Sequence, residues 1–303
     1  MSSSPSEVKP KPPPKPMSEI LENAGKRALG GGLAGSAAMV VQVTTLMWIR
    51  TIMNYQYRYG MSLRQASSTL YAEGGIIRFY RGYFAAIAQG PLSRFGDTAA
   101  NAGVLAVLDA NESTASLPSA VKTIGASGMA ASWRIVITPI DTVKTIMQVE
   151  GRPGLDILFA KARGKGPTVF WHGALAASAA TFAGHYPWFA TYNTLQTVIP
   201  KYDDVLWQKL GRNAGIGFVS SVISDTVSNS LRVVKTYRQT NPEPISYMET
   251  VNRVVEKDGY AGLFGRGLKT RILANGMQGL MFSVMWKMFD DELKKRDFFK
   301  AAK

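Results

Sequence analysis

The sequence predicts an all-α membrane protein whose six long helices form three related repeats. Three observations indicate this class. Long, mostly apolar segments recur along a chain of 303 residues, two sets of landmark residues repeat along it, and 46% of the residues are hydrophobic against 18% that are charged. Because a bilayer needs only about 20 residues of helix, segments of roughly 25–30 residues should tilt or extend beyond it.

The charge and the cysteine content limit the function classes. A net charge of +14 and a pI near 9.9 favour an anionic partner, which can be nucleic acid, a lipid surface or an acidic solute. Six apolar segments argue against a soluble nucleic-acid binder. The chain has no cysteine, which excludes disulfides, thiolate catalysis and cysteine-ligated metal sites.

The first third of the chain sets the plan that the rest repeats. Residues 1–18 hold six prolines and three lysines without apolar periodicity, which predicts a disordered tail. The first repeat, residues 19–112, then reads as a long helix over 28–57, a short helix over 62–71 and a second long helix over 83–108. Glycine-containing turns separate these segments.

The second and third repeats, residues 113–202 and 203–303, follow the same plan, and the three together form one membrane domain over 19–303. Proline and glycine punctuate the ends of the expected helices. The expected helices of these two repeats cover residues 119–149, 155–162, 174–199, 206–240 and 268–293.

Two independent sets of landmarks give the period. A base ends the first long helix of each repeat, and a glycine precedes the second. Lys144 follows Arg50 by 94 residues and Lys235 follows Lys144 by 91. Gly173 follows Gly82 by 91 residues and Gly267 follows Gly173 by 94. The agreement indicates a threefold internal repeat.

The motif Pro139-x-Asp141-x-x-Lys144 and the loop pairs Glu73-Gly74 and Asp258-Gly259 carry a family resemblance. With Tyr80-Arg81-Gly82 downstream, the pattern over residues 26–295 resembles that of the mitochondrial carriers. The resemblance implies a barrel of six tilted transmembrane helices in the mitochondrial inner membrane, with both termini on the intermembrane-space side. It also implies a central cavity that opens alternately to either side, and short helices on the matrix side.

The resemblance further implies a matrix gate of interhelix ion pairs, with Pro139 kinking its helix. The first and third repeats lack both the proline and the acid of the motif, so only Asp141 with Lys235 meets the family pattern. The bases expected to surround this one carboxylate are Arg50, Lys144, Arg232 and Lys235, a local excess of three positive charges that should hold the closed gate poorly. The amides that would brace the gate are Asn54, Gln148 and Gln239.

The family places a second gate late in the second long helix of each repeat. Here the equivalent residues are Tyr192, Asn193 and Gln196 in the second repeat and Lys287 and Asp290 in the third. The first repeat offers no carboxylate and base at these positions, and the third has their order reversed. We expect hydrogen bonds from the second-repeat residues to take the place of ion pairs.

The substrate positions that the resemblance implies are uncharged. They fall at Gln89, Ala180 and Ala274, with Thr181 and Asn275 adjacent.

Charges within the expected spans supply further cavity candidates, because ionisable groups at this depth are costly and usually face a cavity. They are Arg94, Asp97, Arg134, His185 and Asp225. Arg134 and Asp225 lie ten residues before their gate bases, so they are expected to pair across the cavity or to tether two helices. Arg94 with Asp97 is the alternative structural pair. We expect His185 to make an interhelix hydrogen bond rather than bind substrate.

The turns at Gly82, Gly173 and Gly267 begin helices whose first N–H groups suit phosphate, and in the family such turns bind cardiolipin. Most bases of the matrix-side segments are expected to be solvated, in agreement with a positive-side bias. They are Arg58, Arg64, Arg78, Arg81, Lys161, Arg163, Lys165, Arg253, Lys257 and Arg266. With only two histidines and no cysteine, we expect neither a metal site nor a cofactor.

Two functions of different classes fit these observations. One is transport of a small, anionic metabolite across the inner membrane by alternating access. The other is a carrier-derived, non-transporting subunit that serves in the structure or assembly of an inner-membrane complex. The sequence shows no nucleophile with a base and no paired carboxylates, so we do not expect an enzyme.

Overall fold

A computed structural model describes residues 17–201 and 205–281 of the chain. The tail predicted over residues 1–18 lies outside this part except for Met17 and Ser18, which begin helix α1. The predicted domain boundaries remain predictions.

The first repeat contains helices α1 (Met17–Tyr59), α2 (Leu63–Phe79) and α3 (Tyr83–Ala110). Ser62 starts α2 with a capping box, in which its hydroxyl accepts from the backbone of Gln65 and the Gln65 side chain accepts from the backbone of Ser62. Helix α1 is longer than the sequence predicted, and α2 is interrupted by non-helical backbone at Gly74 and Gly75, close to the predicted end of the short helix.

A one-turn helix, α4 (Glu112–Ala115), lies between the long helices of the first and second repeats. The long helices α5 (Ser119–Glu150) and α7 (Ala174–Val198) agree closely with the predicted ranges. Between them lie α6 (Pro153–Lys165), which has its proline in the first turn, and the 3-10 helix η1 (Pro167–Trp171).

The third repeat contains α8 (Leu206–Thr240) and α9 (Tyr247–Gly265). Residues 268–281 are helical, and the rest of the predicted final helix lies outside the described residues. The sequence predicted no bounds for α9, whose run of residues is interrupted at Gly259 by a left-handed backbone conformation.

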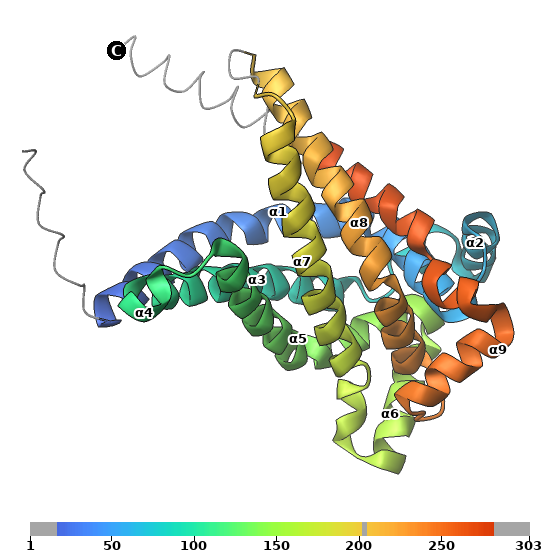
Figure 1. Cartoon of the computed structure of the whole chain (residues 1–303). Coiled ribbons are helices and arrows are strands. Elements are labelled where there is room, and N and C mark those ends of the chain that lie inside the picture. Colours follow the sequence, from blue (N-terminus) through green and yellow to red (C-terminus); the bar gives the residue numbers. More distant parts are fainter. Residues whose placement is uncertain (1–16, 202–204, 282–303) are drawn as a thin grey trace, which may run out of the picture.

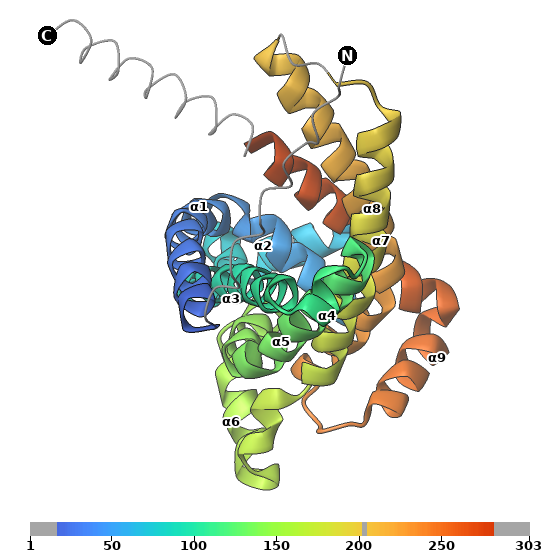
Figure 2. The same cartoon turned by 60° about the vertical axis from the view of Figure 1, so that its left-hand side comes forward.

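The long helices form a ring. Going round it, α1 packs on α3, α3 on α5, α5 on α7 and α7 on α8. The helix of residues 268–281 closes the ring, because it pairs with α8 through Arg271 and packs on α1 through Ala274. Figure 1 shows α2, α6 and α9 gathered on one side of the molecule, while the far ends of α1, α3, α7 and α8 diverge from it. Figure 2 shows the same spread from another side.

The three landmark glycines hold the repeats close together. Gly82 and Gly173 have φ of 82° and 86°, a left-handed conformation that favours glycine. A Cβ on Gly82 would lie 3.0 Å from the Lys144 carbonyl oxygen, and one on Gly173 would lie 3.0 Å from that of Lys235. At Gly267 the close neighbours are Tyr57 and Met53 of α1. Each turn therefore packs on the next repeat, and the last packs on the first.

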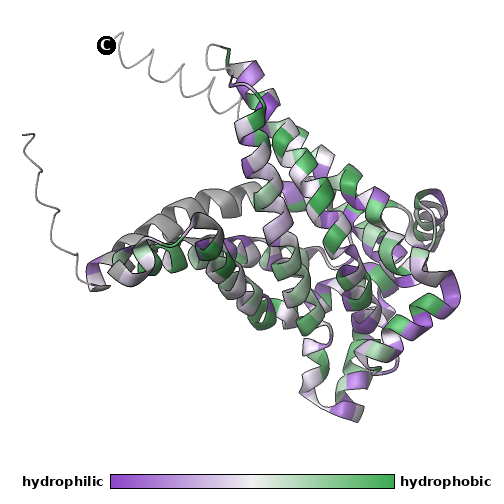
Figure 3. Ribbon diagram, viewed as in Figure 1, coloured by the Kyte–Doolittle hydropathy of each residue, from purple (hydrophilic) through white to green (hydrophobic). Residues whose placement is uncertain are grey.

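The hydropathy of the long helices differs from the expectation of six apolar spans. Within the described residues, no helix combines the length with the apolar character that crossing a membrane requires. Figure 3 shows hydrophilic residues interspersed with hydrophobic ones along α7 and α8. Buried serines such as Ser220, Ser224 and Ser228 lower the hydropathy of α8.

Candidate functional site

A central cavity of about 470 Å³ lies inside the ring and is lined by side chains from all six long helices. Most of the cavity candidates chosen from the sequence line it. These are Gln89, Arg94, Arg134, Ala180, Thr181, His185, Ala274 and Asn275. Asp97 and Asp225 lie behind this lining, bonded to Arg134 and Arg271 respectively. The structure thus brings the candidates together at one cavity, and their contact with a substrate stays a proposal.

One end of the cavity is closed by the predicted pair. The Lys235 ammonium lies 2.5 Å from Asp141 Oδ2, and Lys144 lies 2.7 Å from Asp141 Oδ1. Gln239 donates from Nε2 to Asp141 Oδ2 and to Thr142 Oγ1. The expected interhelix ion pair between α5 and α8 is therefore present. Pro139 lies inside α5, and its kink remains a prediction.

The expected brace amides also act across helices. Asn54 of α1 donates from Nδ2 to Gln148 Oε1 of α5 over 2.6 Å, in a fully buried contact. Together with Gln239, this bond joins the ends of α1, α5 and α8. We call the group of Asn54, Asp141, Gln148, Lys235 and Gln239 the closed end of the cavity.

The prediction that four bases surround Asp141 is wrong for two of them. Arg50 donates from Nη2 to Gln278 Oε1 over 2.9 Å. Arg232 lies 3.9 Å from Asp225, which precedes it by two helical turns on the same face of α8. Asp225 therefore neutralises part of the positive charge that was expected to face Asp141 alone.

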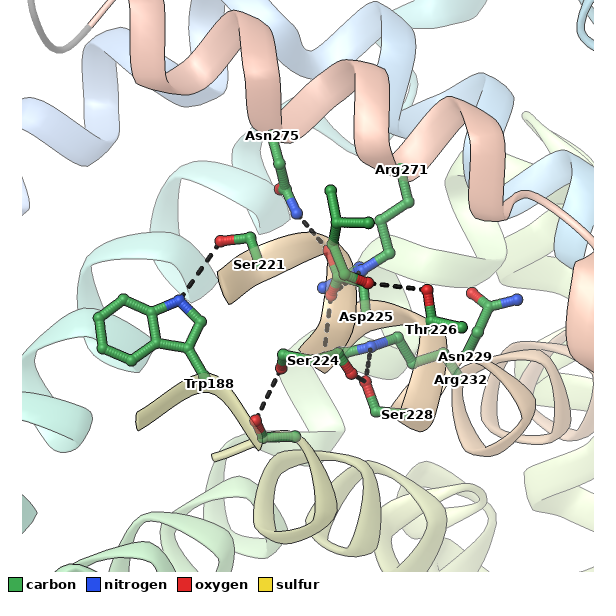
Figure 4. A network of polar contacts seen from close by, with 12 residues as sticks. Trp188, Ser221, Ser224, Asp225, Thr226, Ser228, Asn229, Arg232, Arg271 and Asn275 are labelled. Carbon is green, nitrogen blue, oxygen red and sulfur yellow. Dashed lines mark hydrogen bonds and ion pairs between the residues drawn. The ribbon is translucent and has the colours of Figure 1, made fainter. Parts of the chain in front are cut away.

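The predicted pairing of Arg134 with Asp225 is also wrong. Arg134 Nη2 lies 2.7 Å from Asp97 Oδ2 on α3, and Arg271 Nε lies 2.6 Å from Asp225 Oδ1. Asn275 also donates to Asp225 (Figure 4). Equal register puts the two residues at the same depth, but α5 meets α3 there and α8 meets the helix of residues 268–281. The ion pair of Asp97 likewise crosses to α5, and the expected pairing with Arg94 on its own helix is replaced by this contact.

His185 makes the interhelix contact expected of it. Its Nδ1 lies 3.0 Å from the Ser127 hydroxyl of α5. The imidazole also lines the cavity beside the Asp97 and Arg134 pair, which acts on it electrostatically.

Sequence reasoning missed Arg271, the partner of Asp225. It stands four residues after Gly267, at a position that no motif singles out. Within the described residues, seven basic side chains line the cavity, against three carboxylates that line it or bond to its lining, a difference of four positive charges. The seven bases are Arg50, Arg94, Arg134, Lys144, Arg232, Lys235 and Arg271.

Three bases that were expected to be solvated are instead buried, each only 5% exposed: Arg78, Lys161 and Arg266. Arg78 donates to the carbonyl oxygens of Gln148 and Val149 at the end of α5, over 2.8 and 2.6 Å. Glu73 pairs with the same guanidinium at 2.6 Å. The last carbonyls of a helix have no partner within it and carry partial negative charge, so a cation there stabilises the helix end.

Lys161 and Arg266 do the same for α8 and α1, the first long helices of the other two repeats. Lys161 donates to the carbonyls of Gln239 and Asn241 at the end of α8. Arg266 donates to the carbonyls of Tyr57 and Arg58 at the end of α1, and it pairs with Asp258 at 2.6 Å. Each repeat thus caps a helix of the next repeat. The three bases precede their landmark glycines by 4, 12 and 1 residues, so no shared spacing reveals the role.

Lys161 differs from the two arginines in its charge environment. Burial, together with the nearby Arg238 and Arg58, lowers the pKa of its ammonium to about 8. Burial, Arg238 and Lys161 likewise lower the pKa of His172 to about 4. This corner of the molecule therefore holds several positive groups close together.

At the opposite end of the cavity, hydrogen bonds join α7 and α8. Gln196 accepts from Arg212 Nη1 and donates to Asn213 Oδ1. Tyr192 stacks on Trp188 at 4.8 Å between ring centroids, and Asn193 is exposed. Lys287 and Asp290 lie outside the described residues. Gln196 thus hydrogen-bonds to α8, and its part in a second gate remains a prediction.

The ring of helices, the polar cavity and the closed end give the molecule the architecture expected of a helical solute carrier. The sequence model of the mitochondrial carrier protein family matches residues 116–203 and 206–296, which is more than half of the chain. The protein therefore belongs to the mitochondrial carrier family, as the motifs predicted. Members of this family are transporters and are typically found in the mitochondrial inner membrane. No curated protein matched the chain.

Proposed function

We propose that the protein moves a small, anionic metabolite across the mitochondrial inner membrane. The observation that carries the proposal is the excess of four positive charges around a closed-ended cavity of about 470 Å³. A cavity of this size suits a metabolite-sized ligand. An anion relieves the repulsion among the seven bases, so the occupied cavity is favoured over the empty one.

Alternating access follows from the nature of the closed end. One ion pair, Asp141 with Lys235, and two amide contacts join α1, α5 and α8 there. Such contacts border a polar cavity and exchange for water, so a substrate that binds better to one state can shift the balance between states. Six tilted helices around this cavity form the transmembrane path, with α2, α6 and α9 on the matrix side.

Membrane lipid is proposed as a second partner. Gly82 and Gly173 stand at the N-caps of α3 and α7 without a side-chain cap. Free N–H groups at helix starts suit the phosphates of cardiolipin. This supports an inner-membrane location.

The test is uptake into proteoliposomes of purified protein. We expect saturable uptake of at least one anion from a panel of phosphate, nucleotides, carboxylates and amino acids. Substitution of Arg271 by Gln should reduce that uptake, while the exposed Arg163→Gln variant should match the wild type. Absence of flux with every compound, in vesicles where the protein is shown to be folded, would overturn the transport proposal.

A second candidate is a non-transporting subunit of an inner-membrane complex. The observation that favours it is that α1 and α8 lack the acid at their gate positions, and that Arg50 contacts an amide instead. This function predicts stoichiometric co-purification with a larger complex from mitochondria together with no flux. A monomeric, transporting protein would exclude it.

A further inference from the structure

The three long helices that meet at the closed end are joined unequally. An ion pair and the Gln239 amide join α5 to α8, and the bond of Asn54 with Gln148 joins α1 to α5. Between α1 and α8 the described residues form no ion pair. Arg50, the base of α1 at this level, contacts Gln278 of the last helix instead. Other contacts therefore hold α1 against α8.

Asn241, the residue directly after α8, is contacted by a base from each of the other two repeats. Arg58 of α1 donates from Nη2 to its Oδ1 over 2.9 Å. Lys161 of α6 donates from Nζ to its backbone oxygen over 2.7 Å. The end of α8 lies beside α6 and α9 (Figure 1), and Asn241 is only 3% exposed there. We call the group of Arg58, Lys161 and Asn241 the outer clasp.

The contacts of the outer clasp are oriented and charge-assisted. Asn241 donates from Nδ2 to the Glu243 carbonyl over 2.9 Å, which turns its Oδ1 toward Arg58. The Arg58 guanidinium also lies 4.2 Å from the ring centroid of Tyr237 on α8, a favourable cation–π distance. Hydrogen bonds from a charged donor are stronger than those between neutral groups. The outer clasp thus supplies, between α1 and α8, a charged contact that the closed end lacks.

The surroundings of the clasp also favour its release. Arg58 and Lys161 bind Asn241 without an ion pair to any carboxylate of the described residues. Glu150 acts on Arg58 electrostatically, but both of its oxygens accept from Tyr59. The two bases repel each other, and the buried Nε of Arg58 has no hydrogen-bond partner. Opening relieves the repulsion and lets Nε bind water, so the clasp holds without being permanent.

We propose that the outer clasp is a second lock on the closed end, which opens only when Arg58 and Lys161 release Asn241. The inference rests on the proposed function, in which the cavity opens alternately to either side. Both bases belong to repeats other than that of Asn241. Separation of the first or the second repeat from the third must therefore break one of the two bonds.

The experiment measures opening as the rate at which a buried cysteine reacts with N-ethylmaleimide in the purified full-length protein in detergent. The reporter is Thr145→Cys on α5. Thr145 is 1% exposed, lies between Asp141 and Gln148 in the sequence, and has a hydroxyl without a hydrogen-bond partner. The chain has no native cysteine, so the reporter reacts without background. Where closing is faster than the reaction, the rate follows the population of the open form.

Two substitutions break the bond of Arg58 with Asn241, one from each side. Arg58→Met keeps most of the apolar stem, and Asn241→Ala removes the acceptor. Each should make the reporter react about tenfold faster, because a hydrogen bond to a charged group is lost. The double variant should react about as fast as the faster single variant, since both changes remove the same bond.

Two controls separate the bond from other effects. Arg238→Met removes a positive charge from the same corner, but Arg238 donates to Ile245 within the third repeat, so no contact between repeats is broken. It should leave the reporter at the parent rate or below. Ser220→Cys, at a position of α8 that is 0% exposed, reports general loosening of the fold. Its rate should not change when Arg58→Met is added.

The outcomes distinguish this inference from the transport proposal. Unchanged reaction of Thr145→Cys in both Arg58→Met and Asn241→Ala would overturn the second lock. Equal acceleration of Ser220→Cys, or of Thr145→Cys by Arg238→Met, would assign the effect to loosening or to charge and would also overturn it. If the reporter reacts as expected but no solute is carried into proteoliposomes, the inference stands and the transport proposal fails.

Discussion

Asp141 is the carboxylate that joins α5 and α8 at the closed end. Its replacement by Ala leaves Lys144 and Lys235 close together without an acid, so we expect a loss of about 3 kcal/mol. Lys235→Ala should cost less, because Asp141 keeps its 2.7 Å contact with Lys144. The measurement is thermal unfolding in detergent.

A double-mutant cycle over Asp141→Ala and Lys235→Ala isolates the pair. We expect a coupling of about 1–3 kcal/mol, within the range for residues in direct contact. Additive single effects would show that the 2.5 Å contact does not contribute to stability.

The lowered pKa of Lys161, about 8, predicts a pH dependence. Between pH 8 and the ordinary lysine pKa of about 10.5 the unfolded chain holds a proton that the folded chain has released, so stability should rise with pH in this window. The rise should be absent in Lys161→Met, whatever that variant loses at neutral pH. Unfolding temperatures of both proteins from pH 7 to 10 give the comparison. Parallel curves would contradict the predicted deprotonation.

Residue roles could be predicted where a motif fixes both partners. The pair of Asp141 with Lys235 followed from register, and it is present. Register gives only the depth of Arg134 and Asp225, and their actual partners depend on which neighbouring helix lies beside each one. The capping role of Lys161 was hidden because an exposed base and a capping base have the same local sequence. Such a base is buried only where the end of a helix from another repeat packs on it.

At the scale of elements, the glycine turns that precede the second long helix of each repeat tolerate no side chain. In Gly173→Ala the Cβ would meet the Lys235 carbonyl at 3.0 Å in a left-handed conformation, so we expect a loss of about 1–3 kcal/mol. The matched control is Gly164→Ala in α6, where a Cβ meets nothing within 4 Å. There we expect a small gain, about 0.4–1 kcal/mol, because alanine lowers the entropy of the unfolded chain. Equal unfolding temperatures for the two variants would refute the close packing.

The C-terminal ends of α1, α5 and α8 depend on bases from another repeat. In Arg78→Met the carbonyls of Gln148 and Val149 lose their donors and Glu73 loses its partner, so we expect a loss of about 1.5–3 kcal/mol. The methionine keeps most of the apolar stem. Arg64→Met, on the exposed face of α2, is the control and should stay within about 0.5 kcal/mol of the wild type. A similar loss in both variants would assign the effect to net charge.

The extent of these elements was largely predictable, because glycine and proline mark the ends of α5, α7 and α8. The bounds of α9 were not predicted, and its run of residues is interrupted at Gly259, in the loop pair Asp258-Gly259. The long apolar runs were taken as spans from their low charge content. That interpretation gave too little weight to the buried serines and threonines on the inner faces of these helices, which lower their hydropathy.

For the whole molecule, the closed end should control access to the cavity. The chain has no native cysteine, so paired cysteines at Asn54 and Gln148 react without background. These residues touch across α1 and α5, and a short bifunctional thiol reagent should lock that end and reduce flux by more than about tenfold. Each single cysteine variant, treated in the same way, is the control. Undiminished flux in the cross-linked protein would show that α1 and α5 need not separate there.

The closure of the ring through Arg266 and Gly267 has a consequence for biosynthesis. The end of α1 leaves the ribosome about two hundred residues before the turn that caps its carbonyls and packs on Met53. Until then the first repeat lacks the contacts that the second and third receive from their predecessors. The earliest part of the chain to be synthesised is thus the last to be completed.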